Sequence, residues 1–193
     1  MPRFILASAS PRRLALLRQI GIEPDLIVPS DVDEAALAGE LPRIHAARLA
    51  GAKAREVAQR HGDAVVLGAD TVVACGRRIL SKANHKDEAR RSLGMLSGRS
   101  HTVYGGVCLI DPAGRAYERL VATKVKFKRL QERDIEDYLA ADEWQDKAGA
   151  YAIQGRAAAF VRGINGSYSN VVGLPLYEVV GLLANLGIVA QQT

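Results

Sequence analysis

The apolar and polar positions at the start of the chain follow first the period of a strand and then that of a helix. Residues 4–7 are an apolar run of strand length. Ser10 and Pro11 then form a favourable helix start, and Leu14 and Leu17 repeat at helical spacing before Gly21. This pattern predicts a buried strand followed at once by an amphipathic helix.

The same alternation continues as far as the aspartate at position 70. Residues 25–28 predict a second strand that ends at Pro29, and Pro42 opens a long helical pattern that continues to Arg60. Residues 64–67 are continuously apolar, which predicts a buried strand ending at residues 68–70. Residues 71–74 are expected to remain extended.

Strands dominate the middle of the chain, and helices return near its end. The pattern predicts a helix over 86–96, long strands over 101–110 and 117–130 joined by a turn at 111–114, a helix over 131–141, a hairpin of 160–164 and 169–172 around the turn Asn165-Gly166, and a helix over 176–186. This order predicts an α/β or α+β fold with a mixed sheet. We expect one domain over residues 1–193, because no repeat or linker interrupts the pattern.

Composition narrows the class of protein. The chain has 193 residues, of which 48% are apolar and 24% charged, as is typical of a globular domain. Its apolar runs are shorter than the roughly 20 residues of a membrane span, and Ser8 and Arg12 interrupt the apolar N-terminus before it resembles a secretory signal. We therefore expect a cytoplasmic protein in which Cys75 and Cys108 are buried free thiols.

The net charge of +5 is spread along the chain. Its densest basic stretch alternates Lys124, Lys126 and Lys128 with Val125 and Phe127, which predicts a strand with one solvated basic face. Nucleic-acid binding is one interpretation of such a face, but aromatic residues that could stack on bases are few. Attraction of a small polyanion explains the charge equally well.

Residues 8–13 join the first predicted strand to the first helix and combine several groups that bind anions. The N–H groups at a helix N-terminus favour an anion, and the hydroxyls of Ser8 and Ser10 can donate hydrogen bonds. Arg12 and Arg13 can each bind two phosphate oxygens. Because basic side chains in the first turn are unfavourable for the helix itself, they indicate a bound anion. An ordinary capped helix with solvated arginines is the alternative.

Carboxylates at two places could hold a divalent cation. Asp31, Asp33 and Glu34 lie in a loop after the second strand, and Asp70 ends an apolar strand at the edge where α/β sheets bind ligands. We expect Asp70 to accept a proton from water or to bind a metal, because a carboxylate between apolar segments needs a partner. A solvated acidic turn is the alternative at Glu34.

Three further polar residues are candidates for contacts with a nucleotide. Lys53 in the long helix and Lys82 after residues 79–80 can neutralise phosphate, although Lys53 alone would be interpreted as a surface residue. Gln154 lies in the glycine-containing residues 146–155 and offers both a donor and an acceptor, as reading the edge of a base requires.

Taken in order, these segments resemble the Maf family of nucleoside triphosphate pyrophosphatases. The matching stretches run over nearly the whole chain: residues 6–13, 32–34, 52–54, 67–73, 80–82, 96–101, 146–155, 166–168 and 172–175. Each is a weak signal alone, but so many in one order are specific. The sequence departs from the family pattern at Ala83, where proline is usual, and at Gly105-Gly106, which replaces a threonine-containing stretch.

The resemblance implies an inosine-triphosphatase-like fold, with an elongated mixed sheet, flanking helices and a deep cleft between two lobes. It implies hydrolysis of a nucleoside triphosphate between the α- and β-phosphates with the help of Mg²⁺ or Mn²⁺. Residues 153–155 resemble the subgroup that acts on dTTP and UTP. The resemblance implies Asp70 as general base and Glu34 as its catalytic partner, with both as metal ligands. The residues implied for phosphate binding are Ser8, Ser10, Arg12, Arg13, Lys53 and Lys82. Those implied for base selection are Arg12, Thr71 and Gln154.

Two other functions are compatible with parts of the sequence. A nucleotide-binding regulator, for example one acting in cell division, would keep Arg12, Arg13 and Lys53 but would not need Asp70. A nucleic-acid-binding protein would use the basic strand and would bind with a steep dependence on salt. We expect a small nucleoside triphosphate as the ligand, no nucleic acid or membrane as a partner, and a homodimer as an arrangement compatible with the resemblance.

Overall fold

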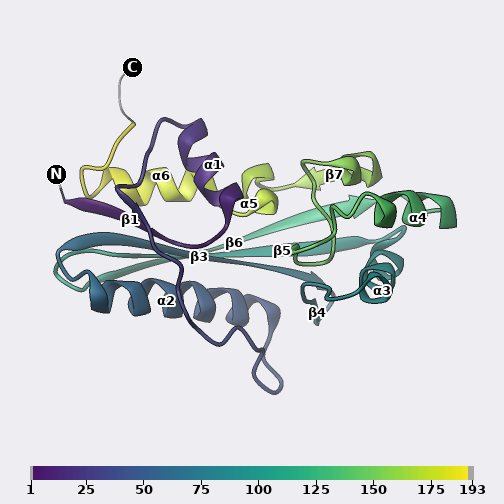
Figure 1. Cartoon of the computed structure of the whole chain (residues 1–193), viewed down its shortest axis with the longest axis horizontal. Helices are drawn as coiled ribbons and strands as arrows, with labels where there is room; N and C mark the ends of the chain where they lie inside the picture. The colour runs from purple at the N-terminus through teal and green to yellow at the C-terminus, as the bar shows by residue number, and fades with distance from the viewer. Residues whose placement is uncertain (1, 191–193) are drawn as a thin grey trace.

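The computed structural model describes residues 2–190, and its seven strands form one elongated mixed sheet (Figure 1). The strands are β1 (Arg3–Ala7), β2 (Leu26–Ile27), β3 (Ala64–Cys75), β4 (Arg78–Leu80), β5 (Ser100–Ile110), β6 (Ala116–Phe127) and β7 (Val161–Asn165). Their order is β2-β1-β3-β5-β6-β7, with β4 paired to β3 outside this path. The pairs β1·β2 and β1·β3 are parallel and the others antiparallel, so the predicted mixed sheet is confirmed.

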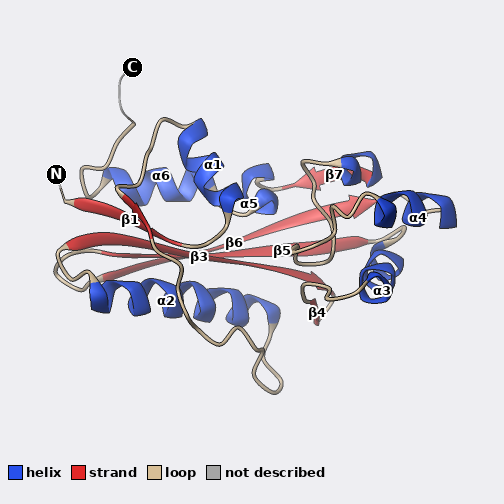
Figure 2. Cartoon of the chain, in the orientation of Figure 1, coloured by secondary structure: helices blue, strands red, loops and turns tan. Residues whose placement is uncertain are grey.

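Helices cover both faces of the sheet (Figure 2). They are α1 (Pro11–Gln19), α2 (Pro42–Arg60), α3 (Lys86–Leu96), α4 (Glu132–Ala140), the 3-10 helix η1 (Arg156–Phe160), α5 (Tyr168–Val172) and α6 (Leu176–Ala184). The long helix α2 lies alone on one face, α1, α5 and α6 lie on the other, and α3 and α4 lie at the far end of the sheet. No helix in residues 2–190 is long and apolar enough to cross a membrane.

Small residues bring α2 unusually close to the sheet. The buried face of this helix carries Ala46, Ala50 and Ala54. A Cβ atom on Gly68 of β3 would lie 2.5 Å from the Ala50 carbonyl oxygen, and one on Gly106 of β5 would overlap the backbone of Ala46. The two glycines therefore leave the space in which the helix backbone lies, and α2 becomes a rigid support for the side chains it carries.

Most of the predicted elements are confirmed, and the differences are instructive. The strand expected to end at Asp70 continues to Cys75, so Asp70 lies inside β3 rather than at its end. Ser10 occupies the predicted N-cap position of α1, but its backbone carbonyl alone bonds the first turn and its side chain makes no cap. Cys108 is buried as expected, whereas Cys75 is only half-buried.

The predicted hairpin of residues 160–164 and 169–172 is wrong. β7 pairs with β6 instead, and residues 168–172 form α5. The Ser167 hydroxyl accepts a hydrogen bond from the Asn170 N–H and so caps the short helix. The buried Asn170 amide donates to the Val103 carbonyl and to the Thr123 hydroxyl, so contacts from β5 and β6 fix a helix where the local pattern favoured a strand.

Candidate active site

A cavity of about 400 Å³ lies beside the point where β1 ends and β3 continues. The last pair between these strands joins Ala7 to Gly68, and β3 then extends beyond its parallel neighbour. The cavity is lined by ten of the candidate residues: Ser8, Ser10, Arg12, Arg13, Glu34, Lys53, Asp70, Thr71, Lys82 and Gln154. The two other carboxylates of the acidic loop, Asp31 and Asp33, do not line it. The expected convergence of these residues is therefore present in the fold.

The open edge of β3 explains why consecutive residues of one strand can share the cavity. Side chains alternate between the two faces of a strand. Asp70 accordingly contacts Lys53 of α2 on one face, and Thr71 contacts Arg13 of α1 on the other. Beyond Ala7 no parallel strand separates the two faces, so the cavity extends around the edge of β3.

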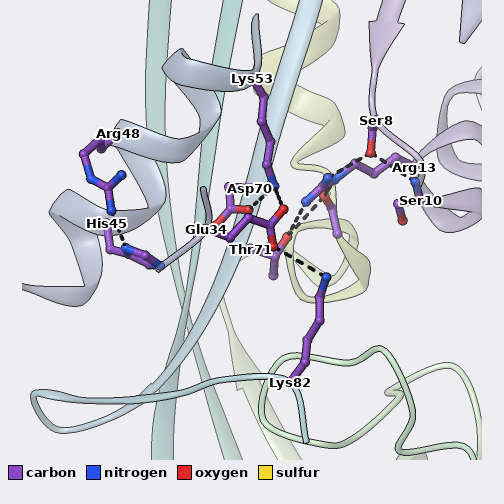
Figure 3. A network of polar contacts seen from close by, with 11 residues as sticks. Ser8, Ser10, Arg13, Glu34, His45, Arg48, Lys53, Asp70, Thr71 and Lys82 are labelled. Carbon is purple, nitrogen blue, oxygen red and sulfur yellow. Dashed lines mark hydrogen bonds and ion pairs between the residues drawn. The ribbon is translucent and has the colours of Figure 1, made fainter. Parts of the chain in front are cut away.

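Lys53 joins the two carboxylates of the cavity (Figure 3). Its Nζ lies 2.6 Å from Glu34 Oε1 and 2.8 Å from Asp70 Oδ1. Lys82 approaches the other Glu34 oxygen, Oε2, at 3.6 Å. Lys53 and Asp70 are only 6% and 7% exposed, so the interpretation of Lys53 as a surface residue is wrong. A buried ammonium between two carboxylates is a charge-compensated arrangement that a polyanionic ligand can rearrange.

The surroundings of Glu34 keep it ionised. Burial acts to raise the pKa of the Glu34 carboxyl. The hydrogen bond from Lys53 and the charges of Lys53, Lys82 and Arg13 outweigh this effect and lower the pKa below its ordinary value. Glu34 is therefore a carboxylate at neutral pH, able to accept hydrogen bonds or to bind a cation.

Arg13 connects three segments that are far apart in the sequence. Its Nη1 donates to the Ser8 hydroxyl at 3.0 Å, its Nη2 to the Thr71 hydroxyl at 3.2 Å and its Nε to the Gly173 carbonyl at 2.9 Å. Burial lowers the pKa of Arg13, but an arginine remains protonated at neutral pH. Three of the five guanidinium N–H groups are thus used within the protein, and the others can reach a ligand.

The remaining predicted residues lie around the rim of the cavity. Arg12 is half-buried and donates from Nε to the Val172 carbonyl at 3.3 Å. Burial lowers the Arg12 pKa, and the nearby Asp146 carboxylate opposes the effect. Ser10 donates its backbone N–H to the Ser8 hydroxyl at 3.2 Å, and Gln154 is exposed at the cavity.

The site also contains residues to which the sequence analysis assigned no role, namely Ser30, Asp146, Lys147 and Tyr151. Three of them, Asp146, Lys147 and Tyr151, lie in residues 146–155, which match the family pattern. Membership of this matching stretch was the feature of the sequence that could have identified them. With Lys147 included, five basic side chains and three carboxylates line the cavity. This excess of positive charge favours a polyanion.

The 146–155 segment is held against Lys82 by backbone contacts. Ala148 forms an isolated antiparallel bridge with Lys82, and the Gly149 N–H donates to the Leu80 carbonyl at 2.9 Å. Asp146 and Ala150 have left-handed φ values of 55° and 57°, which non-glycine residues rarely adopt. Such backbone strain is common at ligand sites, where the surrounding structure enforces it.

The donor set of the cavity fits a divalent cation that is bound together with its substrate. Glu34 and Asp70 each use one carboxylate oxygen for Lys53 and have a second oxygen. Among residues 2–190 there is no group of three or more His, Cys, Asp or Glu side chains placed to hold a metal. Mg²⁺ commonly binds through one or two carboxylates and completes its coordination with phosphate oxygens and water.

Comparisons with known proteins agree with the fold. The family model described as Maf-like protein matches residues 3–186. A dTTP/UTP pyrophosphatase from Paramagnetospirillum magneticum is 59% identical over 187 residues, which cover 97% of this chain and 98% of that protein. Another from Rhodospirillum rubrum is 59% identical over 183 residues, covering 95% and 87%. The solved structure of a HAM1 protein from Coxiella burnetii has a TM-score of 0.55 at 17% identity, over 96% of this chain and 100% of that one, which shows a shared fold.

Proposed function

The chain belongs to the Maf family, and we propose that it hydrolyses dTTP and UTP to the nucleoside monophosphate and pyrophosphate. The names of relatives that are 59% identical over nearly the full length support this substrate class. The observation that carries the proposal is the single cavity in which Lys53 joins Glu34 to Asp70 among further basic side chains.

Phosphate binding is assigned to the basic side of the cavity. The Ser8 hydroxyl accepts from Arg13 and keeps its own hydrogen for a phosphate oxygen. Ser10 and the N-terminus of α1 lie beside it, and Lys82 extends toward Glu34 from a separate segment (Figure 3). Paired contacts from the arginines would fix the triphosphate in one orientation, which is what hydrolysis at a single bridging oxygen requires.

Base selection is assigned to Arg12, Thr71 and Gln154. Gln154 is exposed at the cavity, where its amide can donate and accept at once. The Thr71 hydroxyl contacts Arg13 and, at 3.4 Å, the Gly173 carbonyl, so it links the phosphate-binding side to the loop after α5.

Asp70 is assigned as the general base. Its Oδ1 accepts from Lys53, which fixes the carboxylate, and no described residue donates to its Oδ2. A water bonded to Oδ2 would transfer a proton to Asp70 as its oxygen attacks phosphorus. The new P–O bond forms while the bond at the α–β bridging oxygen breaks, releasing the monophosphate and pyrophosphate. The basic side chains stabilise the charge that develops on the phosphate oxygens.

We expect Glu34 and Asp70 to hold a Mg²⁺ or Mn²⁺ ion with the nucleotide. When bound, such an ion neutralises phosphate charge and polarises the phosphoryl group. Turnover should stop in the presence of a chelator and return on addition of either ion. The cytoplasmic location and the homodimer stay predictions.

The decisive experiment is pyrophosphate release from a panel of ribo- and deoxyribonucleoside triphosphates. We expect dTTP and UTP to be the best substrates, and Asp70→Asn to lower kcat at least 100-fold with an unchanged circular dichroism spectrum. Binding of dTTP without release of pyrophosphate by the wild-type protein would favour the nucleotide-binding regulator instead.

A further inference from the structure

The loop that carries Glu34 has little to hold it in place. Residues 28–41 between β2 and α2 contain neither helix nor strand, and residues 33–39 are all exposed. Leu37, the largest apolar side chain of this stretch, is 60% exposed and packs into no core. The contacts that place Glu34 must therefore be polar, and those at its carboxylate come from Lys53 and Lys82.

A second polar contact holds the loop from behind. Arg48 of α2 donates from Nη2 to the carbonyl of Ala35, the residue next to Glu34, at 3.0 Å. The same guanidinium bonds Glu40 with Nε at 2.7 Å and Nη2 at 2.9 Å. The Glu40 side chain is 4% exposed, although it lies in an otherwise exposed loop.

The Glu40 carboxylate bonds both Arg48 and the backbone of the loop. Its carboxylate also accepts the Leu37 N–H at 3.0 Å and lies 2.9 Å from Nδ1 of His45, which itself is 6% exposed. The hydrogen bond from Arg48, followed by the other contacts, keeps the pKa of Glu40 far below its ordinary value, so Glu40 is ionised throughout the physiological range. A carboxylate only accepts hydrogen bonds, so Nδ1 donates to Glu40 in the tautomer that carries its proton there, and in the other tautomer it accepts from Arg48 Nη2 at 3.1 Å.

Two of the contacts to the loop, those from Arg48 and Lys53, start from the same rigid helix. Arg48 holds the backbone beside Glu34, and Lys53, five positions further along α2, holds the Glu34 carboxylate. The helix itself cannot shift without overlapping β3 and β5, since its backbone lies on Gly68 and Gly106. The position of the carboxylate is thus set at two points.

We propose that Arg48 and Glu40 are positioning residues that set the place of the Glu34 carboxylate for catalysis. This inference rests on the proposed function. Without the Arg48 contact, the loop leaves the position in which Glu34 meets Lys53, and turnover falls. Residues 8–13, which are assigned to phosphate, make no contact with Arg48, so the effect falls on kcat rather than on KM.

A double-mutant cycle tests whether Arg48 acts through Glu34. We expect Arg48→Met to lower kcat for dTTP 10- to 100-fold, because a displacement of about 1 Å can cost about 100-fold, and to change KM less than about 3-fold. In a Glu34→Gln background the same substitution should lower the residual kcat less than about 3-fold. An equal loss in both backgrounds, or an unchanged kcat for Arg48→Met, overturns the proposal.

Two further variants separate positioning from general damage. Arg55→Met removes the same charge from α2 and breaks only a surface pair with Glu118, so kcat should stay at the wild-type value. Arg48→Lys keeps the positive charge at this position. A lysine ammonium, however, cannot replace the contact that two arginine nitrogens make with Glu40. It should therefore lower kcat as Arg48→Met does, with a Tm close to wild type.

The place of the loop can be measured without turnover. Chymotrypsin should cut after the exposed Leu37 at least 10-fold faster in Arg48→Met and Glu40→Gln than in the wild-type protein or in Arg55→Met. Equal cleavage rates overturn the positioning role even if kcat falls. If instead the wild-type protein releases no pyrophosphate, the proposed function fails, while the cleavage rates still decide whether Arg48 and Glu40 hold the loop.

Discussion

His101 should make the protein less stable as the pH falls from neutral to mildly acidic values. Its ring is 2% exposed and lies edge-on to Phe127 and Tyr151, at centroid distances of 5.0 and 5.4 Å. Nε2 is 2.8 Å from the Tyr151 hydroxyl, whereas Nδ1 has no hydrogen-bond partner among the described residues. Burial lowers the His101 pKa from 6.5 to about 4, since a protonated ring would place charge and a second N–H in apolar surroundings.

The sign of the effect follows from proton binding. Between pH 6.5 and about 4 the unfolded chain binds a proton at His101 and the folded protein does not. The contribution of the neutral His101 ring to the free energy of unfolding is therefore complete above pH 6.5, and it is lost as the pH falls through this range. The pKa shift lowers the free energy of unfolding by about 3 kcal/mol once the whole range is passed, and by about 2 kcal/mol at pH 5.

Urea unfolding of the wild-type protein and of His101→Phe at pH 7.5 and pH 5 measures this contribution. Carboxylates also titrate in the range, but their effect cancels in the difference between the two proteins. We expect the wild type to lose about 2 kcal/mol more than the variant, which keeps a ring but has no titrating group. Equal losses in the two proteins, or an NMR titration of His101 near pH 6.5, would refute the reasoning.

Three further predictions concern the helix α2 and the cavity. Gly68→Ala should destabilise the protein by about 1–3 kcal/mol in urea unfolding, because the new methyl group would lie 2.5 Å from the Ala50 carbonyl oxygen. It should also lower kcat, because the methyl group displaces the helix that carries Lys53. Gly94→Ala is the matched control: this glycine of α3 has open space, and alanine should stabilise by about 0.5–1 kcal/mol. Lys53→Met should lower kcat/KM for dTTP at least 100-fold, since it leaves two carboxylates facing the phosphates without their ammonium; a loss below 10-fold would contradict this role. Gln154→Ala should reduce the preference for dTTP and UTP over purine nucleotides about 10-fold, measured as a ratio of kcat/KM, and an unchanged ratio would contradict its role in base selection.

The elements with long, regular patterns could be predicted from the sequence. The helix expected from Pro42 to Arg60 has these bounds in the structure, and the two long central strands differ from prediction by a few residues at their ends. In both cases many consecutive positions repeat the same apolar spacing. The five-residue helix α5 is too short for such a repeat, and its position depends on Asn170 contacts with two distant strands.

Ten members of the candidate site could be named from the sequence, whereas Ser30, Asp146, Lys147 and Tyr151 could not, and the environments of the ten were not predictable. Lys53 in an alanine-rich helix has the local pattern of a solvated side chain, yet it is 6% exposed. Its partners Glu34 and Asp70 lie 19 and 17 positions away, in the loop before α2 and in β3, and meet it only in the folded chain. Arg13 is a stronger example, because its Nε bonds the carbonyl of Gly173, 160 positions away. Burial of this kind depends on tertiary contacts that no local spacing contains.

The glycine pair that departs from the family pattern connects the fold to the site. A Cβ atom on Gly105 would overlap the Asn170 side chain, and one on Gly106 would overlap the backbone of α2, so the two glycines admit one helix on each face of β5. α2 carries Lys53 to one face of β3, and α5 is followed by Gly173, whose carbonyl accepts from Arg13 on the other. The cavity uses both faces because β1 ends before Asp70. The same few strand positions therefore determine how closely the two halves of the site approach each other, and a larger residue at either glycine would separate them.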